Sequence, residues 1–349
     1  MIAFVLGTRP EAIKLAPLIR RIPAEERCLI YTGQHYDQAL AFDVWADCGG
    51  YEFQHILKVV GQTDAERLGS LVSQLAGGIL AGIRFPSIGL EAQRPRWVVV
   101  QGDTTSALAG ALAAAKLDIP VYHVEAGSRS GDKQQPEEMN RKVIDQVASG
   151  HACSYHCDAA NLRREGIMCH LWSGDIAIDA LLADGLPAIE PGDAVVVTIH
   201  RAETLRNAEA VKQITAFMRD LAREQPVVFY RHPHTAQVMT DDLLRGVDAR
   251  EPIPPGEFRQ EMARARAVVT DSGGAAIEAA YMGIPCVIAR EVTELADLAE
   301  CGRVVIGGRE RETLWKAWGE AQRNAPTSEK VQHAWKGRAS ECLAERLMA

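Results

Sequence analysis

The sequence predicts an α/β protein made of two doubly wound, Rossmann-like domains, and two patterns support this prediction. Short apolar segments alternate with helical stretches along most of the chain, as in Trp97–Gln101 followed by Thr105–Leu117. Strands that are apolar on both faces belong to parallel sheets covered by helices on both sides. This alternation of strands and helices occurs twice, and a polar segment at residues 184–193 separates the two halves. We therefore expect two parallel sheets.

Length and composition agree with this fold class. A chain of 349 residues exceeds what one hydrophobic core usually accommodates. Its apolar runs are shorter than a membrane span, and the chain enters its first strand without a basic leader. A net charge of −8 argues against nucleic acid as the main partner. We expect a cytoplasmic protein that binds neither membrane nor nucleic acid.

The expected elements follow from the apolar pattern. The first series of strands is Ile2–Gly7, Cys28–Thr32, Trp97–Gln101, Val121–Val124, Ala152–Ser154 and Leu171–Ser173. The second is Ala194–Ile199, Val227–Tyr230, Ala267–Thr270, Cys286–Ala289 and Val304–Ile306. The expected helices are Glu11–Arg21, Ala65–Ile83, Thr105–Leu117, Asn140–Ala148, Ala208–Arg223 and Ala275–Met282. The domains would span residues 1–177 and 178–330, and a helix in 331–349 would return to the first domain.

Ligands of such folds bind outside the carboxyl ends of the strands, so the residues that follow each strand are candidates for a site. After the first strand, Gly7 permits a tight turn and Pro10 suits the first position of a helix. Arg9 stands between them, where we expect it to face a ligand. Gln34 and His35 follow the second strand in the same way.

Carboxylates follow the next strands. Asp103 comes after Trp97–Gln101, either as a helix N-cap or as a reactive group. Glu125 ends an apolar strand, where a lone carboxylate is costly unless it is paired. Glu137 and Glu138 open a helix, and capping alone would explain one of them.

The second half supplies cations and a glycine-rich turn. Two strands end in an Arg–His pair, His200-Arg201 and Arg231-His232. A third strand runs into Asp271-Ser272-Gly273-Gly274, and a helix follows. Glycines let a ligand approach the backbone, and a helix N-terminus attracts anions, so this turn is a candidate phosphate site. One to two turns later, Glu278 is placed to accept a hydrogen bond from a ribose hydroxyl.

Histidines and cysteines gather between residues 151 and 170. They are His151, Cys153, His156, Cys157, Cys169 and His170. Their spacing lacks the paired halves of a zinc knuckle, so we expect a strand of small buried residues and no metal. The scattered cysteines indicate reduced thiols.

These motifs, taken in order, resemble the nonhydrolysing UDP-N-acetylglucosamine 2-epimerase family. The resemblance covers nearly the whole chain. Its motifs are residues 7–12, 33–35, 102–105, 123–127, 136–141, 178–181, 200–203, 232–233 and 271–274. It implies the GT-B fold, with two domains facing a cleft, no cofactor, a homodimer and a role in polysaccharide biosynthesis.

The resemblance also implies a reaction, in which UDP is eliminated across C1–C2 of the sugar and added back on the other face. The implied acid/base residues are Asp103, Glu125 and Glu137, with His200 assisting at the leaving phosphate. The implied substrate-binding residues are Arg9, Gln34, His35, Arg141, Arg201, His232, Ser272, Gly273, Gly274 and Glu278. The first domain would carry the acid/base groups and the second would hold the UDP.

The chain departs from the family pattern at several points. Only Lys133-Gln134-Gln135 separates Asp132 from Pro136, which shortens a loop next to Glu137. Asp175 and Leu295 replace the Asn and Arg that the family usually carries. These changes leave three alternatives to nonhydrolysing epimerisation: a hydrolysing epimerase releasing UDP and free N-acetylmannosamine, a GT-B glycosyltransferase, and a UDP-sugar binder without turnover.

Overall fold

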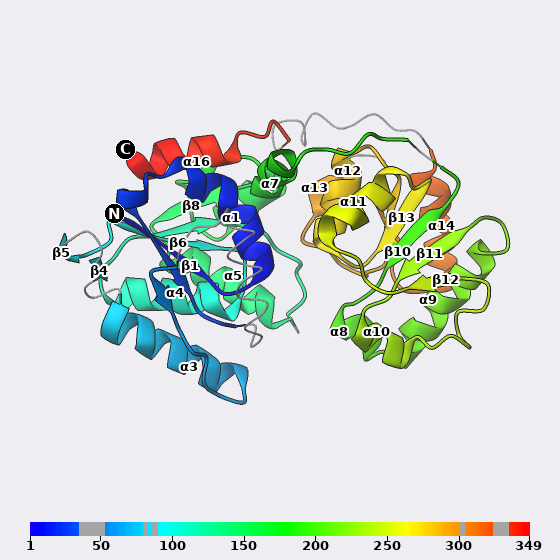
Figure 1. The fold of residues 1–349 in the computed structure, drawn as a ribbon, viewed down its shortest axis with the longest axis horizontal. Helices are drawn as coiled ribbons and strands as arrows, with labels where there is room; N and C mark the ends of the chain where they lie inside the picture. Colours follow the sequence, from blue (N-terminus) through cyan, green and yellow to red (C-terminus); the bar gives the residue numbers. More distant parts are fainter. Residues whose placement is uncertain are drawn as a thin grey trace. The chain divides into compact units, whose positions relative to one another are not determined.

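The protein forms two compact units, each built on a parallel sheet (Figure 1). The computed structural model describes residues 1–34, 53–79, 83–85, 90–133, 135–190, 192–299, 304–323 and 335–349. One unit combines Met1–Ala183 with Ala334–Ala349, and the other is Asp184–His333. The expectation of two parallel α/β sheets is confirmed.

The first unit contains a seven-stranded sheet in the order β3-β2-β1-β6-β7-β8-β9. Its strands are β1 (Ile2–Leu6), β2 (Arg27–Tyr31), β3 (His55–Ile56), β6 (Trp97–Gln101), β7 (Val121–Val124), β8 (Gly150–Cys153) and β9 (Leu171–Trp172). A separate antiparallel pair is formed by β4 (Ile83–Phe85) and β5 (Leu90–Gln93). The order reverses direction between β1 and β6, which makes the loops after these two strands the expected binding point.

The second unit repeats the same winding. Its six strands lie in the order β12-β11-β10-β13-β14-β15. They are β10 (Val195–Thr198), β11 (Val227–Tyr230), β12 (Asp248–Arg250), β13 (Ala267–Thr270), β14 (Cys286–Ile288) and β15 (Val304–Ile306). The reversal falls between β10 and β13, so the loops that begin at His200 and Asp271 are neighbours.

Helices cover both sheets. Those of the first unit are α1 (Arg9–Arg21), α3 (Asp64–Gln74), α4 (Thr105–Lys116), α5 (Pro136–Val147), α6 (His156–Arg164), α7 (Ile176–Asp184) and α16 (Ala339–Met348), with a 3-10 turn at Ala24–Glu26 and a π turn at Leu75–Ile79. Those of the second unit are α8 (Ala202–Leu205), α9 (Ala208–Leu221), α10 (Pro233–Val238), α11 (Pro255–Ala263), α12 (Gly273–Tyr281), α13 (Ala296–Ala299) and α14 (Arg311–Ala321).

The first sheet has an apolar core on each face. Even-numbered residues of β1 pack on one face with α1, and odd-numbered ones pack on the other with α4, because side chains alternate along a strand. The C-terminal helix α16 lies beside α1 (Figure 1) and adds Ala339, Leu343 and Leu347 to the first of these cores. Asp179 of α7 caps α16 by accepting from the backbone N–H groups of Ala339 and Ser340.

Several element boundaries differ from the sequence expectations. The predicted helix Ala65–Ile83 is wrong at its end, because α3 is followed by the π turn Leu75–Ile79 and Ile83 lies in a strand. Of the helix expected over 331–349, residues 331–334 lie outside the described residues, and the described part is helical over Ala339–Met348. Helix α1 starts one residue before Pro10, with Thr8 as its N-cap.

Gly7 is required for close packing at the end of β1. A Cβ atom there would lie 2.0 Å from the Ser106 hydroxyl, which is itself held by Thr32 at 2.6 Å. We expect Gly7→Ala to lower the free energy of unfolding by about 3 kcal/mol, because neither neighbour can move freely. Gly69→Ala in α3, where no described atom lies within 4 Å of the added carbon, should instead stabilise by about 1 kcal/mol. Urea denaturation measures both, and equal effects would contradict the packing argument.

Glu11 closes a buried capping box that ties the first loop to α4. Its carboxylate accepts from the N–H groups of Gly7 and Thr8 at 2.9 and 2.7 Å, and from the Thr104 hydroxyl at 2.7 Å. Burial raises the pKa of Glu11 to about 7, although these donors oppose the shift. We expect Glu11→Ala to cost about 3 kcal/mol of unfolding free energy, because two buried N–H groups lose their acceptor.

The matched control for Glu11 is Glu66, which closes the same kind of box on the exposed helix α3. There, water can replace the lost carboxylate, so Glu66→Ala should destabilise far less. Thermal unfolding of the two variants compares them, and similar losses would show that burial of the Glu11 box is not what matters.

Candidate active site

The candidate site of the first unit lies where the sheet order reverses. The loop after β1 and the loop after β6 meet there, and Glu11 bonds to both of them. Arg9 is half-buried at the first position of α1. The amide oxygen of Gln34 accepts from the N–H and hydroxyl of Ser106, at 3.2 and 2.6 Å, so it holds its loop against α4. His35 lies outside the described residues.

Glu125 is paired, as its position at a buried strand end requires. One carboxylate oxygen accepts from Lys14 Nζ of α1 at 2.8 Å, and the other accepts from the Gln101 amide. Its backbone φ of +65° lies in the left-handed region, where a non-glycine residue is strained. This conformation turns the backbone out of the strand direction at Glu125, and Lys14 and Gln101 hold the side chain in place.

Lys14 was not found from the sequence, although it follows Glu11 by three residues and so lies on the same face of α1. Burial lowers the pKa of Lys14, but Glu125, Asp175 and Asp103 together raise it by more, so the side chain remains an ammonium ion. One half-buried cation therefore acts on two of the predicted acid/base residues, on Glu125 by direct contact and on Asp103 through charge.

Asp103 is paired with Arg141 of α5. The same guanidinium also donates to Glu138 at 3.3 Å, and the Asn140 amide donates to the Asp103 carbonyl oxygen at 2.8 Å. The first turn of α5 thus fixes the loop after β6. Asp103 and Arg141, both predicted, are brought together.

The two glutamates at the start of α5 differ in their surroundings. Glu138 is buried and accepts from the N–H and hydroxyl of Ser130 at 2.9 and 3.1 Å, which ties the preceding loop to the start of α5. Glu137 is exposed at the same helix end. Glu138 thus has a structural role in holding the loop at Ser130, and Glu137 stays a candidate for the reaction.

A buried hydrogen-bond network holds the loops after β6 and β7 in place. The two ring nitrogens of His123 lie 2.6 Å from an Asp145 oxygen and 2.8 Å from the Gly102 carbonyl oxygen. Asp145 also accepts from Gly127 N–H at 3.0 Å and from Arg129 at 2.7 Å. The turns that precede Asp103 and follow Glu125 are therefore fixed to one side-chain pair.

In the second unit, the buried Asp271 organises the point of reversal. Its carboxylate accepts from the N–H groups of His200 and Arg201 at 3.0 and 2.9 Å. The Arg201 side chain donates back to the Asp271 carbonyl oxygen at 3.0 Å. The loops after β10 and β13 are locked together, and this brings His200 and Arg201 next to Ser272.

His200 and His232 lie close together, with ring centroids 5.4 Å apart. Burial lowers the pKa of His200, and the His232 and Arg201 charges act in the same direction, while Asp271 opposes them. His200 is thus a neutral imidazole near pH 7. His232 itself is the N-cap residue of α10.

Helix α12 begins at the turn that the sequence singles out. Ser272 is its N-cap, and the Ser272 hydroxyl accepts from Ala275 N–H at 3.4 Å. Gly273 and Gly274 form the first helical turn, whose N–H groups have no intrahelical acceptor. The geometry suits an anion.

Other predicted residues have partners that change their interpretation. Glu278 pairs with Arg259 of α11 at 3.3 Å, and its pKa is raised chiefly by burial. Arg231 points into its own loop, where it donates to the Met239 carbonyl oxygen and pairs with Asp241 at 2.8 Å. The two Arg–His pairs therefore differ: Arg201 lies at the Asp271 turn, whereas Arg231 is engaged by its own loop.

The cysteine and histidine group between residues 151 and 170 is built into the fold. His151 bonds to the Asp145 carbonyl oxygen at 2.7 Å, and Cys153 is buried in β8. Among the residues that the structure describes, no set of histidine, cysteine, aspartate or glutamate side chains is arranged to hold a metal ion. The same described residues include no helix long and apolar enough to cross a membrane.

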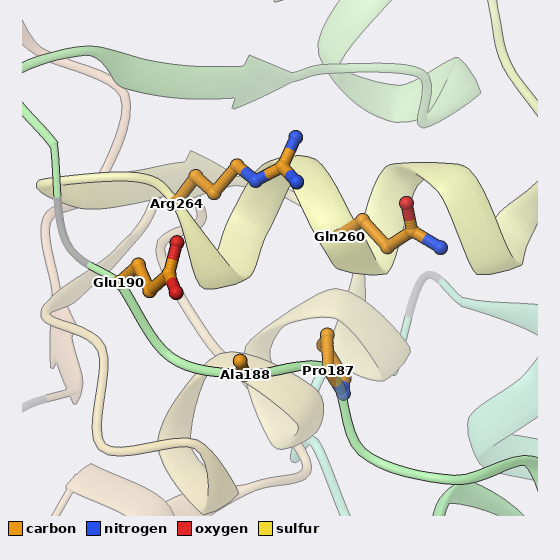
Figure 2. A pocket seen from close by; sticks show the side chains of 5 residues that line it. All are labelled: Pro187, Ala188, Glu190, Gln260 and Arg264. Atoms are coloured by element: carbon orange, nitrogen blue, oxygen red, sulfur yellow. The ribbon is translucent and has the colours of Figure 1, made fainter.

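One surface pocket of about 270 Å³ lies in the second unit. Figure 2 shows its lining of Pro187, Ala188, Glu190, Gln260 and Arg264. These residues precede β10 and β13, so the pocket adjoins the amino ends of the strands. Ligands of doubly wound sheets bind at the opposite ends, and the pocket is therefore not the candidate site.

Comparison with known proteins identifies the family of this chain. A family model described as UDP-N-acetylglucosamine 2-epimerase matches residues 19–348. The UDP-N-acetylglucosamine 2-epimerase of Methanocaldococcus jannaschii is 31% identical over 343 residues, which cover 90% of each chain. The UDP-2,3-diacetamido-2,3-dideoxy-D-glucuronate 2-epimerase of Pseudomonas aeruginosa is 31% identical over 328 residues and 89% of each chain.

Solved structures agree with the sequence relatives. The crystal structure of the M. jannaschii UDP-GlcNAc 2-epimerase in complex with UDP-GlcNAc and UDP matches with a TM-score of 0.84. That match has 29% identity and covers 99% of each chain. The fold class is therefore GT-B, as the motifs implied, and the chain belongs to the UDP-N-acetylglucosamine 2-epimerase family.

Proposed function

We propose that the protein inverts C2 of a UDP-N-acetylhexosamine, converting UDP-N-acetylglucosamine to UDP-N-acetylmannosamine by eliminating UDP and adding it back. The observation that carries this proposal is the arrangement around Lys14, which holds Glu125 directly and lies within the electrostatic reach of Asp103. Acid and base groups coupled through one cation suit a reaction that removes a proton and returns it.

The chemistry requires a base at C2 and a stabilised leaving group. Breaking the C2–H bond while the C1–O bond to UDP breaks gives a C1=C2 alkene, the glycal intermediate. Glu125 and Asp103, which Lys14 and Arg141 anchor, would be acid/base groups, and the exposed Glu137 would serve a second face of the sugar. Anchoring shortens the search for a reactive geometry, which contributes several kcal/mol to such steps.

UDP would be held by the second unit. The N-terminus of α12, with Ser272, Gly273 and Gly274, offers N–H donors and a positive dipole to the diphosphate. Neutral His200 would donate to the leaving phosphate oxygen. Arg9 of the first unit would bind the negative charge of the diphosphate. Glu278 would accept from the ribose.

The remaining predicted groups would support the sugar and nucleotide. They are Gln34, His35, Arg141, Arg201 and His232. We further propose that the protein is a cytoplasmic homodimer in polysaccharide biosynthesis and needs no cofactor. The M. jannaschii relative, whose structure holds UDP-GlcNAc and UDP, supports a UDP-sugar as the substrate.

Incubation with UDP-N-acetylglucosamine in D₂O tests the function directly. We expect deuterium at C2 and appearance of the manno epimer, because the proton removed from C2 exchanges with solvent before the reverse step. Proton NMR follows both signals in one tube.

Other outcomes of this incubation identify the alternatives. Free N-acetylmannosamine with UDP would indicate a hydrolysing epimerase, for which the short loop before Pro136 gives a reason. UDP release that needs an added acceptor would indicate a glycosyltransferase. Binding of the UDP-sugar without any change by NMR would make the protein a binder.

Glu125→Gln should reduce kcat by about 10²–10⁴-fold, because the amide cannot take a proton. UDP affinity, measured by calorimetry, should stay within a factor of about two, since UDP would bind to the other unit. Glu25→Gln, at an exposed position of the 3-10 turn, is the control and should leave kcat unchanged. Full activity in the Glu125 variant would remove this residue from the mechanism.

A further inference from the structure

His123 lies in β7, two residues before Glu125, and its side chain is fully buried. Each of its ring nitrogens faces an oxygen atom. Nδ1 lies 2.6 Å from the Asp145 carboxylate, and Nε2 lies 2.8 Å from the carbonyl oxygen of Gly102, the residue before Asp103. The ring therefore connects α5 to the loop that carries one of the proposed acid/base groups.

The two oxygen atoms determine how many protons the ring carries. A carbonyl oxygen and an ionised carboxylate can only accept hydrogen bonds, whereas a neutral imidazole has one nitrogen that donates and one that accepts. A neutral His123 would therefore place a nitrogen lone pair against an oxygen lone pair at one of the two contacts. An imidazolium donates at both contacts, so it is the state that satisfies the buried ring.

The Asp145 carboxylate is ionised, so it does not supply the proton of this contact. Its second oxygen accepts from Gly127 N–H at 3.0 Å and from Arg129 at 2.7 Å. Burial raises the pKa of Asp145, but the charges and hydrogen bonds of His123 and Arg129 lower it by more. Both carboxylate oxygens act as acceptors, which leaves the proton between Asp145 and His123 on the ring.

The charges of the neighbouring side chains favour the same state. Arg129 donates to Glu165 at 2.9 and 2.6 Å as well as to Asp145. With His123 as an imidazolium, these four side chains carry two positive and two negative charges. A neutral ring would leave one negative charge in excess, and charges removed from water are costly unless they are paired.

We propose that His123 is a positioning residue for Asp103, which it holds in place as a buried imidazolium by donating to the Gly102 carbonyl oxygen. The N–H of Gly102 donates to the Val124 carbonyl oxygen at 3.0 Å. The peptide groups on both sides of Gly102 are thus bonded to consecutive residues of β7, which fixes the glycine at its φ of +68°. This inference rests on the proposed function, in which Asp103 is an acid/base group.

Contacts from α5 hold the next part of the loop. The Asn140 amide donates to the Asp103 carbonyl oxygen at 2.8 Å, and Arg141 pairs with the Asp103 carboxylate. Successive peptide groups of the loop are therefore held by β7 and by α5, and loss of the His123 contact frees the end nearest β6. Misplacing a reactive group by about 1 Å can lower a rate by about 10²-fold.

Nitrogen NMR of protein labelled with ¹⁵N-histidine tests the protonation state directly near neutral pH. His151 is the internal control, because it is buried beside His123 in register on β8. Its Nε2 donates to the Asp145 carbonyl oxygen at 2.7 Å, and its Nδ1 has no partner among the described residues. We expect two protonated nitrogens on His123 and one on His151. A single protonated nitrogen on His123 would overturn the proposal.

Two variants of His123 separate the two contacts of its ring. Counted in bonds from Cα, the amide nitrogen of glutamine matches Nε2, and that of asparagine matches Nδ1. His123→Gln therefore keeps the donor to the Gly102 carbonyl oxygen but loses the contact with Asp145, and His123→Asn does the reverse. The NMR signals of His123 are assigned from their loss in these variants.

The two variants should rank in opposite orders for stability and for activity. His123→Gln should melt at a lower temperature than His123→Asn, because a buried charge loses a partner instead of a neutral carbonyl group. In the D₂O assay, kcat should nevertheless fall about 10²-fold in His123→Asn and about tenfold or less in His123→Gln. KM should be unchanged in both. If activity follows stability, His123 acts only through the fold and the proposal fails.

His151→Asn is the matched control, because it also removes an Nε2 donor from a buried carbonyl oxygen, that of Asp145. This carbonyl group lies in the last turn of α5 and not in the loop that carries Asp103. We expect a lower melting temperature and the wild-type kcat. A loss of kcat equal to that of His123→Asn would show that the loss of any buried histidine contact is sufficient, and the proposal would be wrong.

Hydrogen exchange followed by mass spectrometry tests the position of the loop without any turnover. Opening the loop exposes the Gly102 N–H, which otherwise donates to Val124. The peptide that spans β6 and the start of α4 should exchange faster in His123→Asn than in His123→Gln, and equal exchange would contradict the contact at Gly102. If the wild-type protein incorporates no deuterium into the UDP-sugar, the proposed function fails, and this measurement still decides whether His123 fixes the loop.

Discussion

The cost of removing a carboxylate from water governs both halves of this molecule. Parallel strands covered on both faces end inside the protein, so a charged residue that follows them needs a partner within reach, or it costs several kcal/mol. Glu125 has Lys14 and the Gln101 amide, and Asp271 has two backbone N–H groups. The same pairing that makes these groups tolerable also fixes their orientation, which is what a reactive group needs.

The first and second units meet this constraint differently. In the first, long basic side chains from α1 and α5 reach the strand ends, so Lys14 and Arg141 become part of the site. In the second, the backbone of one loop neutralises Asp271, and the Arg201 side chain folds over it. The arrangement in the first unit places carboxylates beside shared cations. The arrangement in the second unit leaves the N-terminus of α12 able to bind an anion. This difference agrees with a division of labour between proton transfer and phosphate binding.

The positions of site residues could be predicted from the sequence because they depend on local order. A buried strand followed by a polar turn can be recognised from the sequence alone. This pattern correctly placed Asp103, Glu125, His200 and Ser272 at strand ends. The partners of these residues could not be predicted in the same way. Lys14 comes from α1, and its distance from Glu125 depends on how that helix packs on the sheet. Arg201 and Arg231 look equivalent in the sequence, yet a nearby Asp241 draws Arg231 away.

The elements missed by the pattern have physical reasons as well. Strands β3 and β12 are two and three residues long and partly exposed, so neither shows an apolar run. In the stretch after Gln74, continuous apolar residues fit a helix equally well as a strand, and periodicity cannot choose between them.

Helix α16 has a consequence for synthesis of the chain. The core that surrounds β1 includes Leu343 and Leu347, which a ribosome adds hundreds of residues after Leu6. A nascent first unit would therefore emerge with an apolar groove along α1 still open, and it would stay so while the whole second unit is translated. Among the described residues, the core around β10 in the second unit consists of residues between Val195 and Ala321. It can close first, although its residues are made later, and the order of folding then differs from the order of translation.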